Sequence, residues 1–256
     1  MSRRAQDLPV SLPGLRAARV SSDEPYVGVK DTFLISRFEA GHSEFWTHGR
    51  TWTGAPGSVV VFAPGDVHRD VKRDGPVTYQ LIAFVTDAAL SGVQSCLAAG
   101  DPRGLPFQRL HDAVAAGADS FTLDCALAEA MTAMSDLDEP KLQPRRPVRR
   151  ALDLLRGRWA DPLTLDELAA HAGLDKFHLC RAFRAQVGMP PHAYLTQLRI
   201  GHAKQLLARG AKPKDVAPQV GLYDQSQLNR HFRRIVGMTP GMFSAKNRQS
   251  RVAYGD

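Results

Sequence analysis

The chain has 256 residues, of which 43% are apolar, enough for one large domain or for two modest domains with ordinary cores. It contains no run of about 18 or more apolar residues, and this excludes a membrane-spanning helix. The first residues include two arginines without an apolar run behind them, so we expect no signal peptide and a cytoplasmic location. The cysteines are odd in number and far apart, which excludes a disulfide framework or a cysteine-based metal cluster: they are Cys96, Cys125 and Cys180.

The net charge of +7 is divided unevenly along the chain. Residues 144–256 contain 20 Lys and Arg against 8 Asp and Glu, whereas residues 1–143 contain 13 against 18. A basic half joined to an acidic half has two interpretations. The basic surface is either merely solvated, or it binds a polyanion such as nucleic acid. Charge alone does not decide between them.

Short runs rich in β-branched residues, separated by Gly and Pro, occupy residues 26–85. The runs cover residues 27–39, 58–68 and 77–85. Short strands separated by turns at such intervals are typical of antiparallel architectures. This region therefore predicts an antiparallel β-barrel or sandwich.

From residue 87 to residue 137 the apolar spacing changes to that of helices. Within residues 121–137, apolar side chains recur at steps of three or four, which places them on one face of a helix. Two interpretations stay open: the stripe packs against the strands, or it forms an interface with a second subunit. The residues of the stripe are Leu123, Leu127, Met131, Met134 and Leu137.

The segment 136–150, DLDEPKLQPRRPVRR, has the composition of an interdomain linker. It holds three prolines, five basic residues and almost no apolar side chains. Proline removes a backbone donor and fixes φ, so a helix cannot run through such a segment. We therefore expect a first domain at residues 1–137 and a linker at residues 138–148.

The residues after this segment have helical patterns. In residues 148–160, Leu152, Leu155 and Trp159 lie on one side of an amphipathic helix. In residues 164–173, Thr164 followed by Glu167 predicts a capping box, in which each side chain binds an otherwise unpaired backbone amide. The glycine at position 173 suits the left-handed residue that ends a helix.

One sequence frame occurs twice in the basic half, as GLDKFHLCRAFRAQVGMPP (173–191) and as GLYDQSQLNRHFRRIVGMTP (221–240). The Gly-Leu pairs match at an offset of 48, and the residues from Leu179 onward match at an offset of 49. The one-residue slip falls in the turn, where an insertion costs little. Each copy predicts a helix-turn-helix unit, whose second helix can enter a major groove of DNA.

In the second helix of each copy the apolar residues match, whereas the exposed residues differ apart from two paired arginines. Leucine and phenylalanine form an i, i+4 pair in each copy and hold the helix on its partner. Arginine can bind guanine through two hydrogen bonds, glutamine and asparagine can bind adenine, and phenylalanine can pack on a thymine methyl. Solvation alone is the alternative for each exposed residue. We expect DNA contacts from Lys176, Phe177, Cys180, Arg181 and Arg184 in the first copy, and from Gln225, Ser226, Gln227, Asn229, Arg230 and Arg233 in the second.

The segment 190–210 lies between the two copies and has one apolar face over roughly four helical turns. A rigid rod of this kind fixes the spacing of the two recognition helices. If they stand about 34 Å apart, one turn of DNA, they can enter successive major grooves. A single chain then reads two groove segments without a dimer.

Residues 149–246 resemble the C-terminal DNA-binding domain of the AraC/XylS transcription regulators. The stretches 163–207 and 220–243 carry the resemblance, most specifically the run Gly-Leu-Tyr-Asp-Gln-Ser with Arg230 behind it. The resemblance implies two helix-turn-helix units joined by a long helix and bound to asymmetric DNA sites. Pro218 departs from the family pattern, and its missing amide predicts a short or kinked helix before the second recognition helix.

Residues 46–84 resemble, more loosely, the cupin-like sensor domain of the same family, with Pro64-Gly65 followed by His68. An enzymatic cupin needs a His-x-His pair for its metal, and the chain offers only His42, Glu44, His48 and His68, so no metal or cofactor is expected. Sensor domains of this kind usually hold a small effector, while core packing is the alternative for each residue. The resemblance implies effector contacts at Trp46, His48, Trp52, Phe62, His68 and Tyr79.

The sequence therefore predicts an α+β chain of two domains. A cupin-like antiparallel β-barrel with flanking helices would occupy residues 1–137, and an all-α domain with two helix-turn-helix units would occupy residues 149–246, followed by a tail at 247–256. We interpret the chain as a sequence-specific transcription regulator and not as an enzyme, controlled by a small-molecule effector or by dimerisation. Its expected partners are double-stranded promoter DNA, an unknown small-molecule effector, a second copy of the chain and RNA polymerase.

Two alternatives stay open. One is a metal-dependent cupin enzyme fused to DNA-binding helices. The other is a ligand-independent regulator whose barrel is purely structural. The sequence does not predict the effector, the operator or the direction of regulation.

Overall fold

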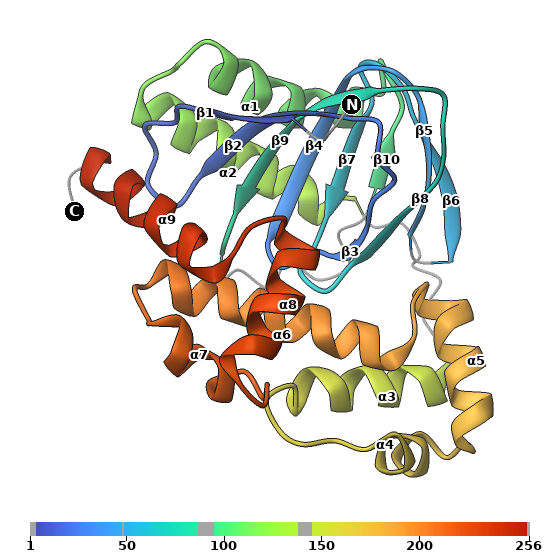
Figure 1. Ribbon diagram of the computed structural model, residues 1–256. Coiled ribbons are helices and arrows are strands. Elements are labelled where there is room, and N and C mark those ends of the chain that lie inside the picture. Colours follow the sequence, from blue (N-terminus) through green and yellow to red (C-terminus); the bar gives the residue numbers. More distant parts are fainter. Residues whose placement is uncertain (1–3, 48, 87–94, 138–144, 255–256) are drawn as a thin grey trace. The chain divides into compact units, whose positions relative to one another are not determined.

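The computed structural model describes residues 4–47, 49–86, 95–137 and 145–254, and the chain divides into two compact units (Figure 1). The N-terminal unit, residues 1–142, holds the strands, a short 3-10 helix η1 (Pro102–Gly104), and helices α1 (Leu105–Ala115) and α2 (Ser120–Ser135). The C-terminal unit, residues 143–256, is helical in its described part. No helix among the described residues has both the length and the apolarity needed to cross a bilayer.

The strands of the N-terminal unit pair into two antiparallel sheets. The six-stranded sheet has the order β1-β2-β9-β4-β7-β10, and the four-stranded sheet has the order β3-β8-β5-β6. Their bounds are β1 (Arg4–Leu8), β2 (Arg16–Ser22), β3 (Val27–Val29), β4 (Phe33–Ala40), β5 (Ser43–Thr47), β6 (Arg50–Gly54), β7 (Val59–Phe62), β8 (Val67–Arg73), β9 (Val77–Phe84) and β10 (Ser95–Leu97).

Alternation along β4 explains how the six-stranded sheet is buried on both faces. Phe33 and Ile35 belong to a core with residues of α1 and α2, whereas Leu34 and Phe38 belong to an aromatic cluster between the two sheets. Successive side chains of a strand point to opposite faces, so one strand serves both cores. Fully burying each such side chain stabilises the fold by roughly 1.5–3 kcal/mol.

The apolar stripe of residues 121–137 lies in the core on the helix side. Leu123, Met134 and Leu137 are buried there, and Leu127 and Met131 are partly buried against the same cluster. The packing interpretation of the stripe is therefore confirmed, because all five side chains belong to this core or pack against it. Asp119 starts the helix by accepting a hydrogen bond from the backbone amide of Thr122.

The prediction of a closed barrel needs correction. Among the described residues, no strand pairing joins the two sheets, and β3 and β10 are edge strands of only three residues each. An edge strand of three residues offers few backbone groups for further pairing, so the ladders of the two sheets do not join into a barrel. Where β6 and β10 approach each other, the side-chain thiol of Cys96 lies 3.6 Å from the backbone carbonyl oxygen of Thr53.

Five strands lie outside the β-branched runs of the sequence. β1 and β2 precede residue 26, β5 and β6 form a hairpin around the Glu-Phe-Trp and Thr-Trp-Thr runs, and β10 lies in the region with helical spacing. Their sequences contain charged or polar side chains at positions where strands usually have β-branched residues, so we expected no strands there. Tertiary pairing with β9, β8 and β7 makes them strands, because strand preference depends on neighbours more than on the residue itself.

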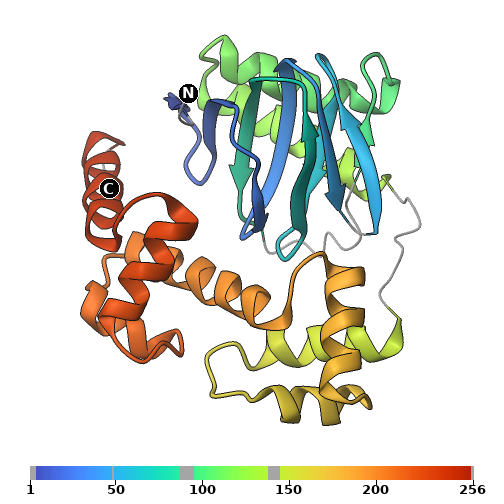
Figure 2. The ribbon, with the colours of Figure 1, turned by 45° about the vertical axis from the view of Figure 1, so that its right-hand side comes forward.

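Helices of the C-terminal unit form two groups around a central rod, α6 (Figure 2). Helices α3, α4 and α5 pack against one another and against the first part of the rod, while α7, α8 and α9 pack on α6 at its other end. The bounds are α3 (Arg146–Gly157), α4 (Leu165–Ala172), α5 (Lys176–Val187), α6 (Pro191–Ala208), α7 (Pro213–Gln219), α8 (Gln225–Val236) and α9 (Pro240–Tyr254).

Two of the expected boundaries differ from the structure. Helix α3 begins at Arg146, inside the expected linker of residues 138–148, because Pro147 stands in its first turn, where a helix needs no amide donor. Residues 138–144 of that linker lie outside the described residues. Helix α9 runs through the expected tail as far as Tyr254.

The two sequence copies fold alike, down to their helix caps. Asp175 and Asp224, 49 residues apart, accept backbone hydrogen bonds at the N-termini of α5 and α8. The copies also share a ring contact: Phe183 meets Tyr194, and Phe232 meets Phe243, each at 70° between ring planes. The predicted capping box at Thr164 and the left-handed glycine at position 173 are both confirmed.

The prediction of a short helix near Pro218 is also confirmed. Helix α7 has 7 residues and ends at Gln219, directly after the proline. Val216, Ala217 and Val220 are nonetheless fully buried in the core of the second unit. Packing therefore holds this helix in place although proline removes one of its hydrogen bonds.

Candidate DNA-binding surface and interior ligand site

The first recognition helix, α5, separates a buried face from an exposed one. Leu179 and Phe183 are fully buried and anchor the helix, whereas Phe177 is 70% exposed. An apolar ring left in water at this position has no packing role in the described structure. Of the residues expected to contact DNA, Lys176, Phe177, Arg181 and Arg184 are exposed and Cys180 is half-buried.

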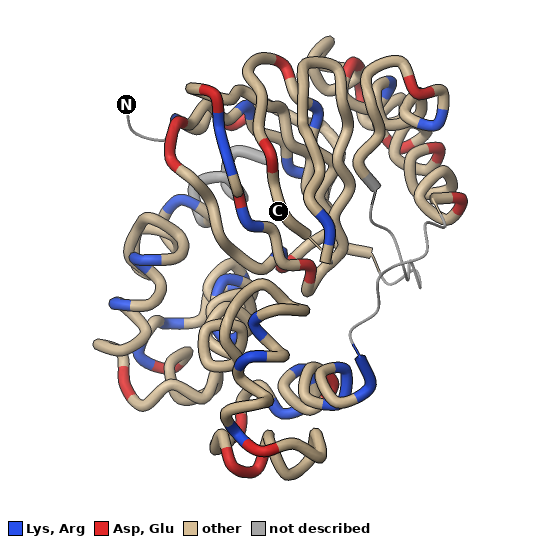
Figure 3. Tube along the Cα trace, turned by 90° about the vertical axis from the view of Figure 1, so that its right-hand side faces the viewer, with Lys and Arg blue, Asp and Glu red and all other residues tan. Residues whose placement is uncertain are grey.

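Lys176 has a partner within the unit. Its Nζ lies 3.3 Å from the carboxylate of Asp166 on α4, and both side chains are largely exposed. A surface ion pair of this kind contributes about 0–1 kcal/mol. DNA phosphate can therefore take over this lysine at little cost. Figure 3 shows Lys and Arg spread over the helices of the C-terminal unit, in line with its positive balance.

The second recognition helix, α8, is likewise anchored by a buried pair, Leu228 and Phe232. Gln227 differs from its neighbours because its side chain has a local role. Its Oε1 accepts a hydrogen bond from the Tyr223 amide at 2.8 Å, and its backbone amide donates to Asp224 at 2.7 Å. Of the residues expected to contact DNA from this helix, the exposed ones are Gln225, Ser226, Asn229, Arg230 and Arg233.

A loop of the first helix-turn-helix group, residues 158–161, is fastened to the rod between the two recognition helices. The Arg199 guanidinium on α6 donates to the backbone carbonyls of Trp159 and Asp161, at 2.8 and 2.9 Å. The Trp159 ring stacks on His202 of the same helix. These bonds hold the orientation of the first group relative to α6.

The same loop also contacts the second group. The α-carbon of Gly221 faces the carbonyl oxygen of Ala160 so closely that a Cβ could not be accommodated. The loop thereby bridges α6 and the turn before α8. Trp159 was expected inside a helix, and neither Arg199 nor His202 was anticipated, because these contacts join residues about 40 positions apart.

The N-terminal unit brings together four of the expected effector contacts. Trp52, Phe62 and Tyr79 lie in or against the aromatic cluster between the sheets, and the His68 ring stacks on Phe62 with centroids 5.1 Å apart. Trp46 does not join them: it alternates with the buried Phe45 and lies under the Arg69 guanidinium on the other face of the sheet. His48 lies outside the described residues.

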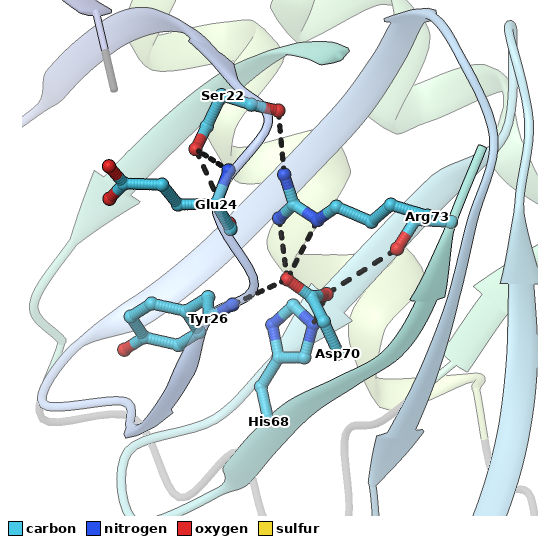
Figure 4. Close-up of polar contacts among 7 residues, drawn as sticks. Ser22, Glu24, Tyr26, His68, Asp70 and Arg73 are labelled. Carbon is cyan, nitrogen blue, oxygen red and sulfur yellow. Dashed lines mark hydrogen bonds and ion pairs between the residues drawn. The ribbon is translucent and has the colours of Figure 1, made fainter. Parts of the chain in front are cut away.

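A buried ionic network fixes the orientation of His68 (Figure 4). The Asp70 carboxylate accepts hydrogen bonds from the Arg73 guanidinium, from the Tyr26 backbone amide at 2.7 Å and from His68 Nε2 at 3.1 Å. Burial opposes ionisation of Asp70, but the His68 hydrogen bond and the other donors lower its pKa to about 2. Burial, together with the charge of Lys30, lowers the pKa of His68 to about 4.

These contacts determine the tautomer of His68. Because Asp70 is an ionised acceptor, Nε2 of the neutral imidazole must carry the proton, and Nδ1 must present a lone pair. Nδ1 is buried without a hydrogen-bond partner, and so is the donor Nε1 of Trp52. A buried polar atom left unpaired costs about 1–3 kcal/mol. The inner face of the four-stranded sheet therefore offers one acceptor and one donor beside aromatic rings.

Asp70, Arg73 and Tyr26 were not anticipated as members of this site. The alternation of β8 was a usable signal, because it places residues 68 and 70 on one face of the strand. The contribution of Tyr26, 44 residues away from Asp70, had no local signal. Among the described residues, no group of three or more His, Cys, Asp or Glu side chains could hold a metal ion.

Two protein-family models match the chain. A model described as an AraC-like ligand binding domain matches residues 16–169, and one described as a helix-turn-helix domain matches residues 168–246. The uncharacterized HTH-type transcriptional regulator YbfI of Bacillus subtilis is 27% identical over 220 residues, 77% of this chain and 79% of that protein. The HTH-type transcriptional activator AarP of Providencia stuartii is 32% identical over 103 residues, 40% of this chain and 73% of that protein.

A solved structure resembles the whole fold. The crystal structure of ToxT from Vibrio cholerae O395 has a TM-score of 0.51 with this chain at 11% identity, covering 95% of this chain and 97% of that one. At this identity the likeness shows the fold alone. It indicates that an arrangement of antiparallel sheets followed by helix-turn-helix groups occurs in other proteins.

Proposed function

This chain belongs to the AraC family of transcriptional regulators, and from that premise we propose how its two units divide the work. It is a DNA-binding transcription regulator with a ligand-binding N-terminal domain, in a family of regulators that are not enzymes. Family membership sets aside the alternative of a metal-dependent cupin enzyme. The proposals concern which residues bind which partner.

The exposed residues of α5 and α8 contact promoter DNA. The observation that carries this proposal is the repeat: the two helices have matching caps and matching buried residues, and they share two exposed arginine positions, yet their other exposed residues differ. The shared needs of folding explain the matching caps and buried residues, and different base pairs explain the differing exposed residues. Arg181, Arg184, Arg230 and Arg233 are the candidates for guanine or phosphate, and Gln225 and Asn229 are the candidates for adenine.

The inner face of the four-stranded sheet, around His68 and Trp52, is the proposed effector site. Its unpaired acceptor and unpaired donor would both be satisfied by a small molecule that carries a hydroxyl or amide group. Phe62 and Tyr79 supply apolar surface beside them. Residues 1–137 would act as the effector-binding and dimerisation domain, and the helices from Arg146 onward, which include the expected residues 149–246, would act as the DNA-binding domain.

Dimerisation and contact with RNA polymerase complete the proposal. The side chains of Phe121 and Leu105, 79% and 53% exposed on α2 and α1, offer apolar surface for a second copy of the chain. The relative AarP, which is named as a transcriptional activator, favours activation as the mode of action. A regulator that binds promoter DNA in this way would act in the cytoplasm.

A DNA-binding titration tests the proposed function. The purified full-length protein is mixed with a labelled fragment from the region upstream of its own gene, with random DNA of equal length as competitor, at increasing salt. We expect a complex that survives competitor at salt concentrations where random DNA has dissociated, because base contacts do not depend on counterion release. Equal loss of both complexes with salt would refute sequence-specific binding.

A further inference from the structure

The two helix-turn-helix groups differ by one residue in the turn, and the structure identifies that residue. In the first copy Gly173 and Leu174 are followed directly by the capping Asp175, whereas in the second copy Tyr223 separates the Gly-Leu pair from Asp224. The glycines have similar backbone angles, φ of 73° and 70°. The extra residue is therefore Tyr223, inserted between two positions that are otherwise equivalent.

Folding does not require this tyrosine. Its side chain is 92% exposed, whereas the preceding Leu222 is buried in the core of the second group. The first turn forms the same left-handed glycine and the same aspartate cap without any inserted residue. A ring that is 92% exposed gains little stability from burial, so packing within the chain does not account for a tyrosine at this position.

The backbone of Tyr223 is nevertheless held firmly. Its amide donates to Oε1 of Gln227 at 2.8 Å, and the amide of Gln227 donates to the Asp224 carboxylate. Gln227 thus ties the inserted residue to the first turn of α8. The backbone of Tyr223 is consequently held at the N-terminal end of a recognition helix, which is the end that approaches base edges in a helix-turn-helix complex.

We propose that Tyr223 binds the sugar–phosphate backbone of DNA at the edge of the groove that α8 reads. Its hydroxyl donates a hydrogen bond to a phosphate oxygen, and its ring lies against the neighbouring deoxyribose. Tyrosine is among the side chains that make such contacts, which set the register of a protein on the duplex without reading sequence. The contact rests on the proposed function. It gives the second recognition helix, α8, a backbone contact that the first recognition helix, α5, lacks.

The chemistry of a neutral phenol separates this proposal from the alternatives. Removal of a Lys or Arg that binds phosphate weakens binding and also lowers the salt slope, because fewer counterions are released. Removal of a tyrosine hydroxyl weakens binding by the same factor on every sequence and leaves the salt slope unchanged. A base contact would change the ratio between the preferred site and random DNA.

The test compares Tyr223→Phe and Tyr223→Ala with the wild-type full chain on its own upstream fragment and on random DNA, over a range of salt concentrations. A hydrogen bond to a charged group contributes enough that we expect roughly tenfold weaker binding of both DNAs by Tyr223→Phe. Tyr223→Ala should bind still more weakly. The matched control is Val71→Ala, which removes another exposed apolar side chain, from β8 of the N-terminal unit, and should bind DNA as the wild type does.

Single methylphosphonate substitutions in the DNA then locate the contact. One neutral phosphate should weaken binding of the wild type more than binding of Tyr223→Phe, because the variant has already lost the hydrogen bond and loses only the attraction to the phosphate charge. Unchanged affinity of both tyrosine variants would overturn the proposal, and so would a loss confined to the preferred sequence. Unchanged affinity with impaired transcription would assign Tyr223 to a protein partner instead. Failure of the wild type to prefer its own fragment would refute the proposed function itself, whatever the variants do.

Discussion

The indole ring of Trp159 lies flat on the imidazole ring of His202, with centroids 3.7 Å apart and planes within 10° of parallel. The tryptophan belongs to the loop after α3, and the histidine belongs to the rod, α6. Together with the two hydrogen bonds of Arg199, this contact fastens the first helix-turn-helix group to the rod that carries the second. The spacing of the two recognition helices therefore depends on residues that lie outside both of them.

A double-mutant cycle tests the stacking contact. Trp159→Ala and His202→Ala should each destabilise the chain, and the double variant should lose less than the sum by about 0.5–1.5 kcal/mol, the usual coupling of an aromatic pair. Urea unfolding of the four proteins measures the coupling. Strictly additive losses would show that the stack contributes no interaction energy.

Gly221→Ala should destabilise the chain more than the same change at its twin, Gly173. Both glycines have positive φ, so alanine costs about 1–2 kcal/mol at either position. Only at position 221 does the new methyl also meet a backbone oxygen, that of Ala160, whereas nothing lies within 4 Å of it at position 173. Thermal melting of the two variants compares the losses. Equal losses would contradict the close approach of the 158–161 loop.

Asp70→Asn should lower the free energy of unfolding of the N-terminal unit by about 3–5 kcal/mol. The substitution leaves the Arg73 guanidinium buried without a counter-charge. The matched control is Asp74→Asn, since Asp74 pairs with Lys72 on the surface and should lose less than about 1 kcal/mol. Chemical denaturation followed by Trp fluorescence distinguishes the two. Similar losses would mean that the network around Asp70 is as hydrated as a surface pair.

His111 should make the N-terminal unit sensitive to mild acid. The ring is fully buried on α1, neither nitrogen has a hydrogen-bond partner, and burial, with the charge of Arg37, lowers its pKa to about 3. Between that value and the ordinary 6.5, the unfolded chain binds a proton that the folded chain does not, so stability falls as the pH falls below 6.5. His68 acts in the same direction down to about pH 4.

His111→Leu should therefore reduce the loss of stability between about pH 7 and about pH 5. Urea denaturation of the wild type and the variant at both pH values gives the difference. His192→Leu, at an exposed position of the C-terminal unit, serves as the control and should leave the pH dependence unchanged. A variant at position 111 that loses as much stability in acid as the wild type would show that His111 is not the group responsible.

Arg230→Ala should relax the choice of base at one position of the operator, at a cost of roughly 1–3 kcal/mol for the preferred sequence. Lys176→Ala should instead weaken binding to all sequences and lower the salt slope by about 1. Binding to a set of singly substituted operators separates the two responses. An Arg230→Ala protein that keeps the full preference of the wild type would remove this arginine from the base-reading set.

The sequence by itself determined the helical half of the protein almost completely. The capping residues Thr164 and Asp175, the left-handed glycines and the buried pairs such as Leu179 with Phe183 are all set by bonds between residues at most a few positions apart. Such bonds are visible as spacing in the sequence, and they identified the two recognition helices and most of their exposed residues. Pro147 was misjudged because its effect depends on whether it stands in the first turn of a helix or inside it.

Only the tertiary structure decided the geometry of the N-terminal unit. Trp46 and Trp52 look alike in the sequence, but the pairing of β5 with β6 puts them on opposite faces of one sheet. His68 became part of a buried network because a loop 44 residues from Asp70 donates an amide to that carboxylate. Strand pairing joins distant residues, and a shift of one residue in register reverses every side chain, so local patterns cannot fix it. The same limit hid the stack of Trp159 on His202, which depends on where a loop meets a distant helix.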